Sequence, residues 1–134
     1  MIRTFLDSGV LLTAWKGKDR MRALAVMEDT EREFVTGQLV RLELIPKAAY
    51  HKQTAEVRLY EAHFSRATSE EALSAELGRE AFALGKKYGL AAADAINIAA
   101  AIRQGAQEFV TSELPGKPLF RVREIRVTAL PTVS

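Results

Sequence analysis

Cysteine is absent from this chain of 134 residues, and histidine occurs only twice, as His51 and His63. Without cysteine the protein has no disulfide, no thiol nucleophile and no cysteine-bound zinc or iron–sulfur centre. Two histidines are too few for a histidine-rich metal site, and we expect both to be surface residues without a functional role. Any metal is therefore expected to bind oxygen ligands, which favours Mg²⁺, Mn²⁺ or Ca²⁺.

Long apolar runs are also absent, and the N-terminus does not show the pattern of a signal peptide. We therefore expect a cytoplasmic protein without a membrane-spanning segment. Apolar residues make up 48% of the chain and charged residues 27%, which is typical of a globular protein. The length predicts a single domain over residues 1–134, and the net charge of +2 is compatible with a nucleic-acid partner.

Short apolar strands alternate with helical patterns along the chain. Strands are expected at residues 2–6, 34–36 and 108–111, and within an extended tail at 120–130. Helices are expected at residues 8–16, 18–28, 38–51, 54–67 and 90–103, with a further helix that Ser69 caps and Gly89 ends. The core stripe of that further helix is predicted to be Leu73, Leu77, Ala81, Leu84 and Tyr88. This alternation predicts an α/β fold with a mainly parallel sheet.

Asp7 stands between two apolar segments in the stretch TFLDSGVLL. It follows the first expected strand and precedes the first expected helix, so it is either a helix cap or part of a functional site. Sites of parallel sheets form at the carboxyl ends of the strands. Asp7 lies at such an end if residues 2–6 form a central strand.

Three further acids hold comparable positions. Glu43, in QLVRLELIP, lies on a helix that is apolar nearly all round, so we expect it to be buried, either paired with an arginine or in a site. Asp94 and Asn97 are the only polar side chains in LAAADAINIAAAI and share a helix face, although an acid there also complements the helix dipole. Glu113, in FVTSELPG, follows a strand and is either a solvated loop residue or a fourth member of one cluster.

Carboxylates that converge repel one another unless a cation lies among them. A divalent metal ion supplies that charge, in agreement with the missing cysteine and scarce histidine. Two such ions about 3.5–4 Å apart stabilise the attacking and leaving oxygens in phosphodiester cleavage. The four acids therefore predict metal-dependent phosphodiester chemistry.

These stretches resemble the motifs of PIN-domain ribonucleases, which include the toxins of bacterial and archaeal toxin–antitoxin pairs. FLDSGVLL is similar to the opening motif of that family, and LVRLELIPKA to the segment that carries its second acid. YGLAAADAINIAAAI matches the third segment most closely, and FVTSE resembles the last. The resemblance covers essentially the whole chain.

The resemblance implies a three-layer α/β/α fold with a mainly parallel sheet of four or five strands. It also implies Mg²⁺- or Mn²⁺-dependent cleavage of RNA, a small antitoxin protein as partner and, in many members, a homodimer. The catalytic, metal-binding acids would be Asp7, Glu43, Asp94 and Glu113. The residues that hydrogen-bond around them would be Ser8, Thr111 and Asn97.

Two positions depart from the family pattern. Gly9 stands where the family usually has asparagine, and Glu113 stands where the last acid is commonly aspartate. The alternative hypothesis is therefore a catalytically degenerate PIN-like module that binds nucleic acid or protein.

Basic side chains near the motifs are candidates for contacts with RNA phosphates, although each is also typical of a solvated surface. The candidates are Arg41, Lys47, Lys117, Arg121 and Arg123. Trp15, next to Lys16, is a candidate for base stacking, but a packing or interface role is more usual for tryptophan.

Two other α/β folds match the sequence less well. A receiver-like domain needs paired acids near its start, and this chain has only Asp7 there. A flavodoxin-like domain needs a phosphate-binding loop rich in glycine, serine or threonine, which is absent.

Overall fold

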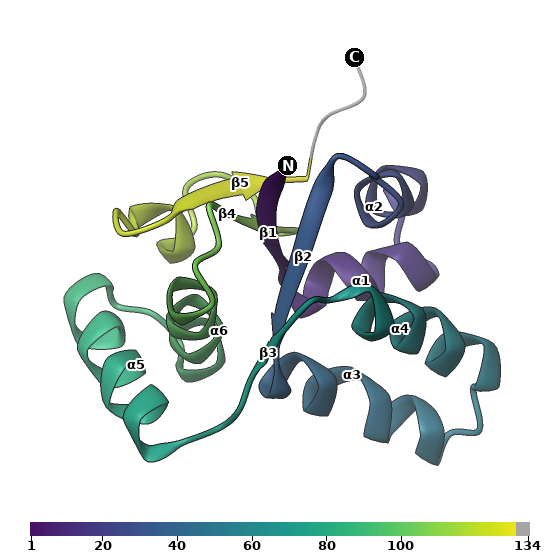
Figure 1. Cartoon of the computed structure of the whole chain (residues 1–134), viewed down its shortest axis with the longest axis horizontal. Coiled ribbons are helices and arrows are strands. Elements are labelled where there is room, and N and C mark those ends of the chain that lie inside the picture. Colours follow the sequence, from purple (N-terminus) through teal and green to yellow (C-terminus); the bar gives the residue numbers. More distant parts are fainter. Residues whose placement is uncertain (131–134) are drawn as a thin grey trace.

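Five parallel strands form one sheet in the computed structural model, which describes residues 1–130 (Figure 1). Their bounds are Ile2–Leu6 (β1), Arg32–Gly37 (β2), Glu70–Glu71 (β3), Glu108–Thr111 (β4) and Arg126–Ala129 (β5). Their order across the sheet is β3-β2-β1-β4-β5, and every neighbouring pair runs parallel. The carboxyl ends of the strands therefore lie at one edge of the sheet, where sites of α/β folds form.

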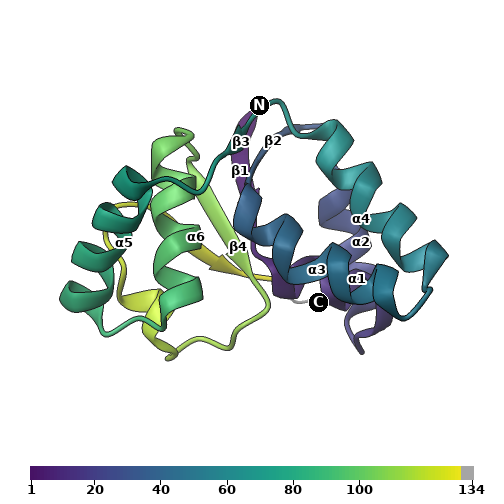
Figure 2. The same cartoon turned by 90° about the horizontal axis from the view of Figure 1, so that it is seen from below.

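Helices cover both faces of this sheet. Their bounds are Ser8–Lys16 (α1), Arg20–Met27 (α2), Gln38–Tyr50 (α3), Thr54–Arg66 (α4), Ala75–Tyr88 (α5) and Ala92–Arg103 (α6), with a short 3₁₀ helix at Pro118–Arg121 (η1). The first four lie on one side of the sheet, and α5 and α6 lie on the other (Figure 2). The predicted three-layer α/β/α fold with a mainly parallel sheet is confirmed.

The central strand β1 is deeply buried between β2 and β4. Phe5 and Leu6 have no exposed surface, and the ring of Phe5 stacks on that of Phe109 with the two centroids 5.4 Å apart. Asp7 is the next residue. It therefore lies in the middle of the carboxyl edge of the sheet, as the sequence predicts.

The predicted helix cap at Ser69 is wrong. Glu70–Glu71 form the edge strand β3 beside β2, and the cap of α5 is Ser74, whose Oγ accepts a hydrogen bond from the Leu77 backbone N–H at 3.0 Å. Leu73 precedes the helix and is 43% exposed, so it does not belong to the core stripe. Three members of that stripe are buried as expected, namely Leu77, Ala81 and Leu84.

The tail at residues 120–130 is extended only in part. Its beginning belongs to η1, which buries Leu119, and only β5 forms a strand, paired with β4 at the edge of the sheet. No helix among residues 1–130 is long and apolar enough to cross a membrane. The predicted domain extends to Ser134, and residues 131–134 lie outside those that the structure describes.

The prediction that both histidines lie at the surface is wrong for His63. This residue of α4 is 2% exposed, and its ring lies edge-on to Phe34 and Phe64 with centroid distances of 5.3 and 5.7 Å. Neither ring nitrogen has a hydrogen-bond partner among the described residues. Burial, assisted by the nearby charge of Arg66, lowers the pKa of His63 to about 4. The residue belongs to the buried stripe of α4, which begins at Tyr60.

Candidate active site

Asp7 connects the central strand to the first helix. It occupies the cap position of α1, and its Oδ1 accepts a hydrogen bond from the Ser8 backbone N–H at 2.8 Å. Its Oδ2 accepts a second hydrogen bond from the Thr111 hydroxyl at 3.2 Å, and its own N–H donates to the Val110 carbonyl at 2.9 Å. Only 7% of Asp7 is exposed. The acid is thus a helix cap that is also held against the end of β4.

Glu43 is exposed, which corrects the prediction that it lies on a buried helix face. The buried stripe of α3 runs through Val40, Leu44 and Ala48, so Glu43 lies beside this stripe and not within it. Its Oε1 accepts a hydrogen bond from Nδ2 of the buried Asn97 at 3.0 Å. This contact joins α3 to α6 across the carboxyl edge of the sheet.

Asp94 and Glu113 complete the set of predicted acids. Asp94 lies in the first turn of α6 and is half-buried. Glu113 lies in the exposed turn after β4, where its backbone N–H donates to the Thr111 hydroxyl at 3.1 Å. The hydroxyl of Thr111 therefore bridges Asp7 and the backbone of Glu113.

The four acids lie close enough together for their charges to raise the pKa values of Asp7 and Asp94. Burial raises the pKa of Asp7 to about 7, and the charges of Asp94 and Glu43 act in the same direction against the hydrogen bonds from Ser8 and Thr111. Burial also raises the pKa of Asp94, assisted by the charges of Glu113 and Glu43. Repulsion of this kind requires the carboxylates to be neighbours.

No basic side chain neutralises this cluster within the part of the chain that the structure describes. The ion pairs of residues 1–130 include none of the four acids, which removes the arginine partner considered for Glu43. Asn97 Oδ1, beside Glu43, also has no hydrogen-bond partner among these residues. Oxygen ligands with uncompensated negative charge suit a hard divalent cation. However, no three acidic or histidine side chains in residues 1–130 stand close enough to form a complete metal site.

A model of the PIN domain matches residues 4–113. The chain belongs to the PIN domain family. The matched segment begins just before Asp7 and ends at Glu113, so it includes all four acids. A search of curated proteins found no match.

Several solved structures share this fold at low sequence identity. This PIN domain matches VapBC2 from Rickettsia felis bound to a promoter DNA fragment at 15% identity, with a TM-score of 0.71 over 96% of this chain and 98% of that one. It matches DNA-bound VapBC from Salmonella typhimurium at 15% identity, with a TM-score of 0.69 over 98% and 100%. A toxin–antitoxin complex from Klebsiella pneumoniae matches at 18% identity, with a TM-score of 0.67 over 97% and 99%.

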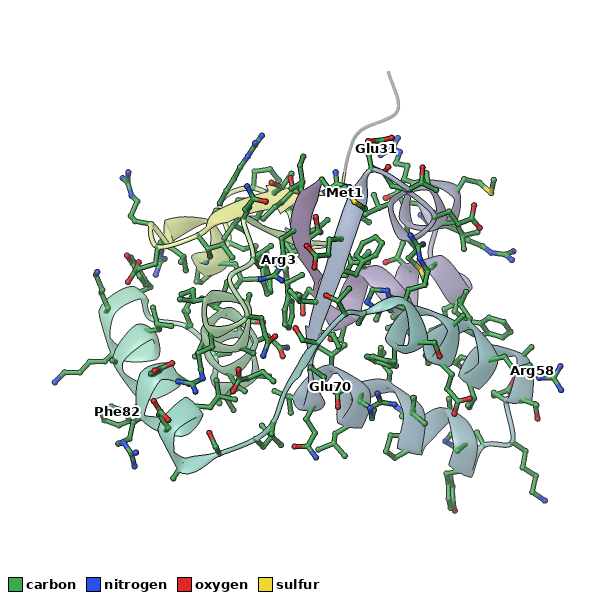
Figure 3. All side chains as sticks on the ribbon, viewed as in Figure 1. Met1, Arg3, Glu31, Arg58, Glu70 and Phe82 are labelled. Atoms are coloured by element: carbon green, nitrogen blue, oxygen red, sulfur yellow. The ribbon has the colours of Figure 1, made fainter. Side chains whose placement is uncertain are left out.

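The predicted RNA-binding cations of this PIN domain have different surroundings. Arg41 forms an ion pair at 2.7 Å with Glu70, which is labelled in Figure 3. Its guanidinium also lies over the ring of Phe64, so these two contacts occupy it. Lys47 lines a cleft together with Glu43, and no carboxylate of the described residues lies within ion-pair distance of it. On α3, therefore, it is Lys47 and not Arg41 that accompanies an acid of the cluster.

The three cations of the C-terminal segment lie at or near η1. Arg121 donates to the Tyr88 carbonyl at 3.0 Å, beside the turn that leads into α6. Lys117 and Arg123 are exposed, and neither forms an ion pair within residues 1–130. Arg121 thus contacts the end of α5 through its guanidinium, and Arg123 contacts it through its backbone N–H, which donates to the Tyr88 hydroxyl at 3.3 Å.

Sequence reasoning missed Ser112, whose hydroxyl lies beside Gly9, one of the two positions that depart from the family pattern. A Cβ atom at position 9 would lie 2.3 Å from the Ser112 Oγ, so the serine hydroxyl fills the space beside the glycine. No local pattern could have revealed this contact, because Gly9 in α1 and Ser112 after β4 are far apart in the sequence. The missing side chain at position 9 and the hydroxyl at position 112 have to be considered as a pair.

Proposed function

We propose that this PIN domain is a divalent-metal-dependent endoribonuclease and the toxin of a toxin–antitoxin pair. The observation that carries the proposal is the mutual repulsion of four acids at the carboxyl edge of the sheet, namely Asp7, Glu43, Asp94 and Glu113. None of the four forms an ion pair with a basic side chain of residues 1–130. The cofactor is Mg²⁺ or Mn²⁺, since carboxylate oxygens suit both ions.

Each acid has a distinct role in this proposal. Asp7 and Asp94 are the more buried pair and would provide fixed oxygens to a cation, whereas the exposed Glu43 and Glu113 would provide oxygens on less confined side chains. The described side chains do not form a complete site as they stand, so the two exposed glutamates would have to supply the remaining ligands. A bound divalent ion would act as a Lewis acid and would lower the pKa of a water bound to it, so that a nucleophile is available at neutral pH.

The residues around the acids hold them in place. The Thr111 hydroxyl and the Ser8 N–H fix both oxygens of Asp7, and the Asn97 amide orients Glu43. Asn97 is nine-tenths or more buried, so its amide has little freedom to move away. Groups of this kind set the direction of a ligand's lone pairs and are often as sensitive to substitution as the ligands.

The toxin role rests on the family and on the solved complexes that share the fold. VapBC and toxin–antitoxin complexes are among the matched structures, and this chain covers nearly their full length. We therefore propose a small antitoxin as the protein partner, a homodimer as the assembly and the cytoplasm as the compartment. RNA is the proposed substrate.

The test is cleavage of a mixed pool of single-stranded RNA by the purified chain in Mn²⁺, in Mg²⁺ and in EDTA. We expect cleavage only with a divalent metal, and we expect Asp7→Asn and Asp94→Asn each to reduce it by about a hundredfold or more. Glu61→Gln, an exposed acid on α4, is the matched control and is expected to cleave like wild type. Equal cleavage by wild type and Asp7→Asn would contradict the proposal.

The second candidate is a PIN-like module that binds nucleic acid or protein without cleaving it. The observation in its favour is that the described side chains do not form a complete metal site, together with glycine at position 9. Calorimetry with Mn²⁺ separates the two candidates. A folded wild type that binds no Mn²⁺ and cleaves no RNA would support the binding module.

A further inference from the structure

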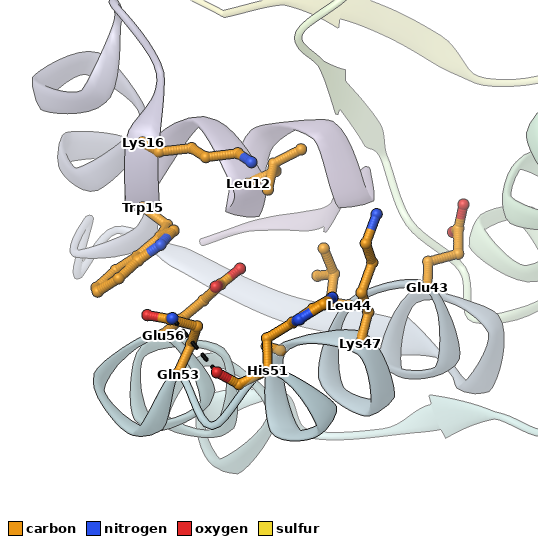
Figure 4. A pocket seen from close by; sticks show the side chains of 10 residues that line it. Leu12, Trp15, Lys16, Glu43, Leu44, Lys47, His51, Gln53 and Glu56 are labelled. Atoms are coloured by element: carbon orange, nitrogen blue, oxygen red, sulfur yellow. Dashed lines mark hydrogen bonds between the residues drawn. The ribbon is translucent and has the colours of Figure 1, made fainter.

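A cleft of about 420 Å³ lies between α1, α3 and the beginning of α4 (Figure 4). Trp15 and Lys16 line it from α1, and Glu43, Lys47 and His51 line it from α3. Its volume is within the range of small-molecule sites in proteins. Glu43 also belongs to the acid cluster, so the cleft reaches that cluster at Glu43.

The aromatic wall of this cleft is the indole of Trp15. The side chain is half-buried and packs on the core from one side. No aromatic ring or cation of the described residues stacks on it. A fixed indole face at the wall of a cleft is a surface on which a planar base can stack.

The charges of the cleft favour a phosphate group beside that base. Lys16 and Lys47 extend between α1 and α3 in Figure 4, and neither has a carboxylate within ion-pair distance among residues 1–130. Two acids also line the cleft. Glu56 accepts a hydrogen bond from the Tyr60 hydroxyl at 2.5 Å, and Glu43 accepts one from the Asn97 amide at 3.0 Å. The two ammonium groups, which form no ion pair with either acid, are the groups of the cleft that a nucleic-acid phosphate complements.

We propose that this cleft is a nucleotide subsite, in which Trp15 stacks on one base of the RNA and Lys16 and Lys47 contact its phosphates. The inference rests on the proposed ribonuclease function, because a base bound in the cleft would place the next phosphate of the RNA at the four acids. It adds a requirement on the substrate. The base has to be unpaired to reach the indole, so the RNA is single-stranded beside the bond that is cleaved.

The chain contains a single tryptophan, so its fluorescence reports on this cleft alone. We would titrate the full chain with short single-stranded RNA in EDTA, where cleavage does not occur, and excite at the red edge of the indole absorption. We expect saturable quenching by single-stranded RNA. No quenching is expected from the same sequence in a duplex. If single-stranded RNA leaves the Trp15 emission unchanged, the proposal is overturned, and a protein partner becomes the better candidate to bind the cleft.

Substitutions separate stacking from packing. Trp15→Leu keeps an apolar side chain but has no aromatic face, and we expect it to weaken RNA binding about tenfold, as measured by anisotropy of labelled RNA. Trp15→Phe keeps a stacking face and is expected to restore most of that affinity. If the two variants are equally folded by circular dichroism and bind RNA equally, the stacking role is excluded.

The lysines are tested against a matched control. Lys16→Ala and Lys47→Ala are each expected to weaken binding and to reduce its dependence on salt, because each removes a phosphate contact. Lys86→Ala is the control, since Lys86 is an exposed lysine of α5 on the opposite side of the sheet. Equal loss of affinity in all three variants would show a general charge effect and overturn the subsite.

Failure of this inference differs from failure of the ribonuclease proposal. Metal-dependent cleavage with no quenching of Trp15, and with wild-type affinity in Trp15→Leu, would remove the subsite and leave the ribonuclease. Quenching by single-stranded RNA without cleavage in any metal would keep the nucleotide subsite and remove the enzymatic step.

Discussion

At the scale of single residues, Asp7 shows how a buried cluster of acids lowers the stability of the fold. The carboxyl is buried among other acids, and its pKa is raised to about 7 from an unfolded value of 3.8. The folded state therefore holds its proton up to a higher pH than the unfolded state does. Without a metal, the free energy of unfolding therefore falls as the pH rises from about 4 to about 7, because the folded state then has to hold a buried charge.

The first prediction is that Asp7→Asn stabilises the metal-free protein at neutral and alkaline pH. Asparagine keeps an oxygen for the Ser8 N–H but has no charge to desolvate. The shift of about three units corresponds to roughly 4 kcal/mol at pH 8 and to almost nothing near pH 4. Urea unfolding of both proteins in EDTA at these two pH values measures the difference.

Added Mn²⁺ provides the control for this prediction. It is expected to raise the melting temperature of wild type, because binding to the folded state alone stabilises that state, and to raise that of Asp7→Asn much less. A variant that is less stable than wild type at pH 8 in EDTA would show that Asp7 acts as a helix cap and carries no electrostatic cost.

At the scale of elements, α5 shows how a local pattern predicts a helix but mistakes its beginning. Ser69 and Ser74 both precede acidic residues in a helical stretch, and each is a typical cap by composition. The structure selects Ser74, because residues 70–71 pair with β2 as an edge strand. A contact between segments that lie far apart in the sequence thus moved the helix start by several residues.

The second prediction distinguishes these two serines. Ser74→Ala removes the acceptor for the Leu77 N–H and is expected to lower the free energy of unfolding by about 1 kcal/mol. Ser69→Ala is the matched control, since it removes an exposed hydrogen bond to Gln104 and is expected to cost less than about 0.5 kcal/mol. The measurement is urea unfolding at one pH. The opposite ranking would return the helix start to residue 69.

At the scale of the whole molecule, two buried groups give the stability opposite dependences on pH. His63 has a pKa of about 4 in the folded state and 6.5 when unfolded, so the unfolded state binds a proton first as the pH falls. Its contribution is complete above about pH 6.5 and is lost as the pH falls to about 4. Asp7 changes stability in the other direction over nearly the same range. Metal-free wild type is therefore expected to show a shallow pH profile.

The third prediction is that His63→Leu makes the profile steeper by removing one of these opposing contributions. The variant is expected to gain about 3 kcal/mol relative to wild type at pH 4, and to show no such pH-dependent gain above pH 6.5. Thermal melts in EDTA between these pH values measure the change. His51→Leu, which replaces an exposed histidine, is the control and is expected to keep the wild-type slope. The prediction fails if the two variants give the same profile.

Local sequence determined the fold class of this protein and the place of Asp7. The alternation of apolar strands and helices predicted the α/β fold, and the position of Asp7 directly after the first strand predicted that it would lie at the carboxyl edge of the sheet. These features are readable because they depend on side-chain periodicity and on the residues directly after each strand, both of which are short-range properties.

Only the tertiary structure decided the rest. The pairing of β3 with β2, the burial of His63 between two phenylalanines, and the exposure of Glu43 beside the stripe of α3 all depend on which helix face meets which neighbour. The hydroxyl of Ser112 beside Gly9 and the Trp15 cleft arise in the same way. Such contacts join residues that are distant in the chain. The periodicity of one segment shows which of its faces is apolar, but it does not show which other segment packs against that face.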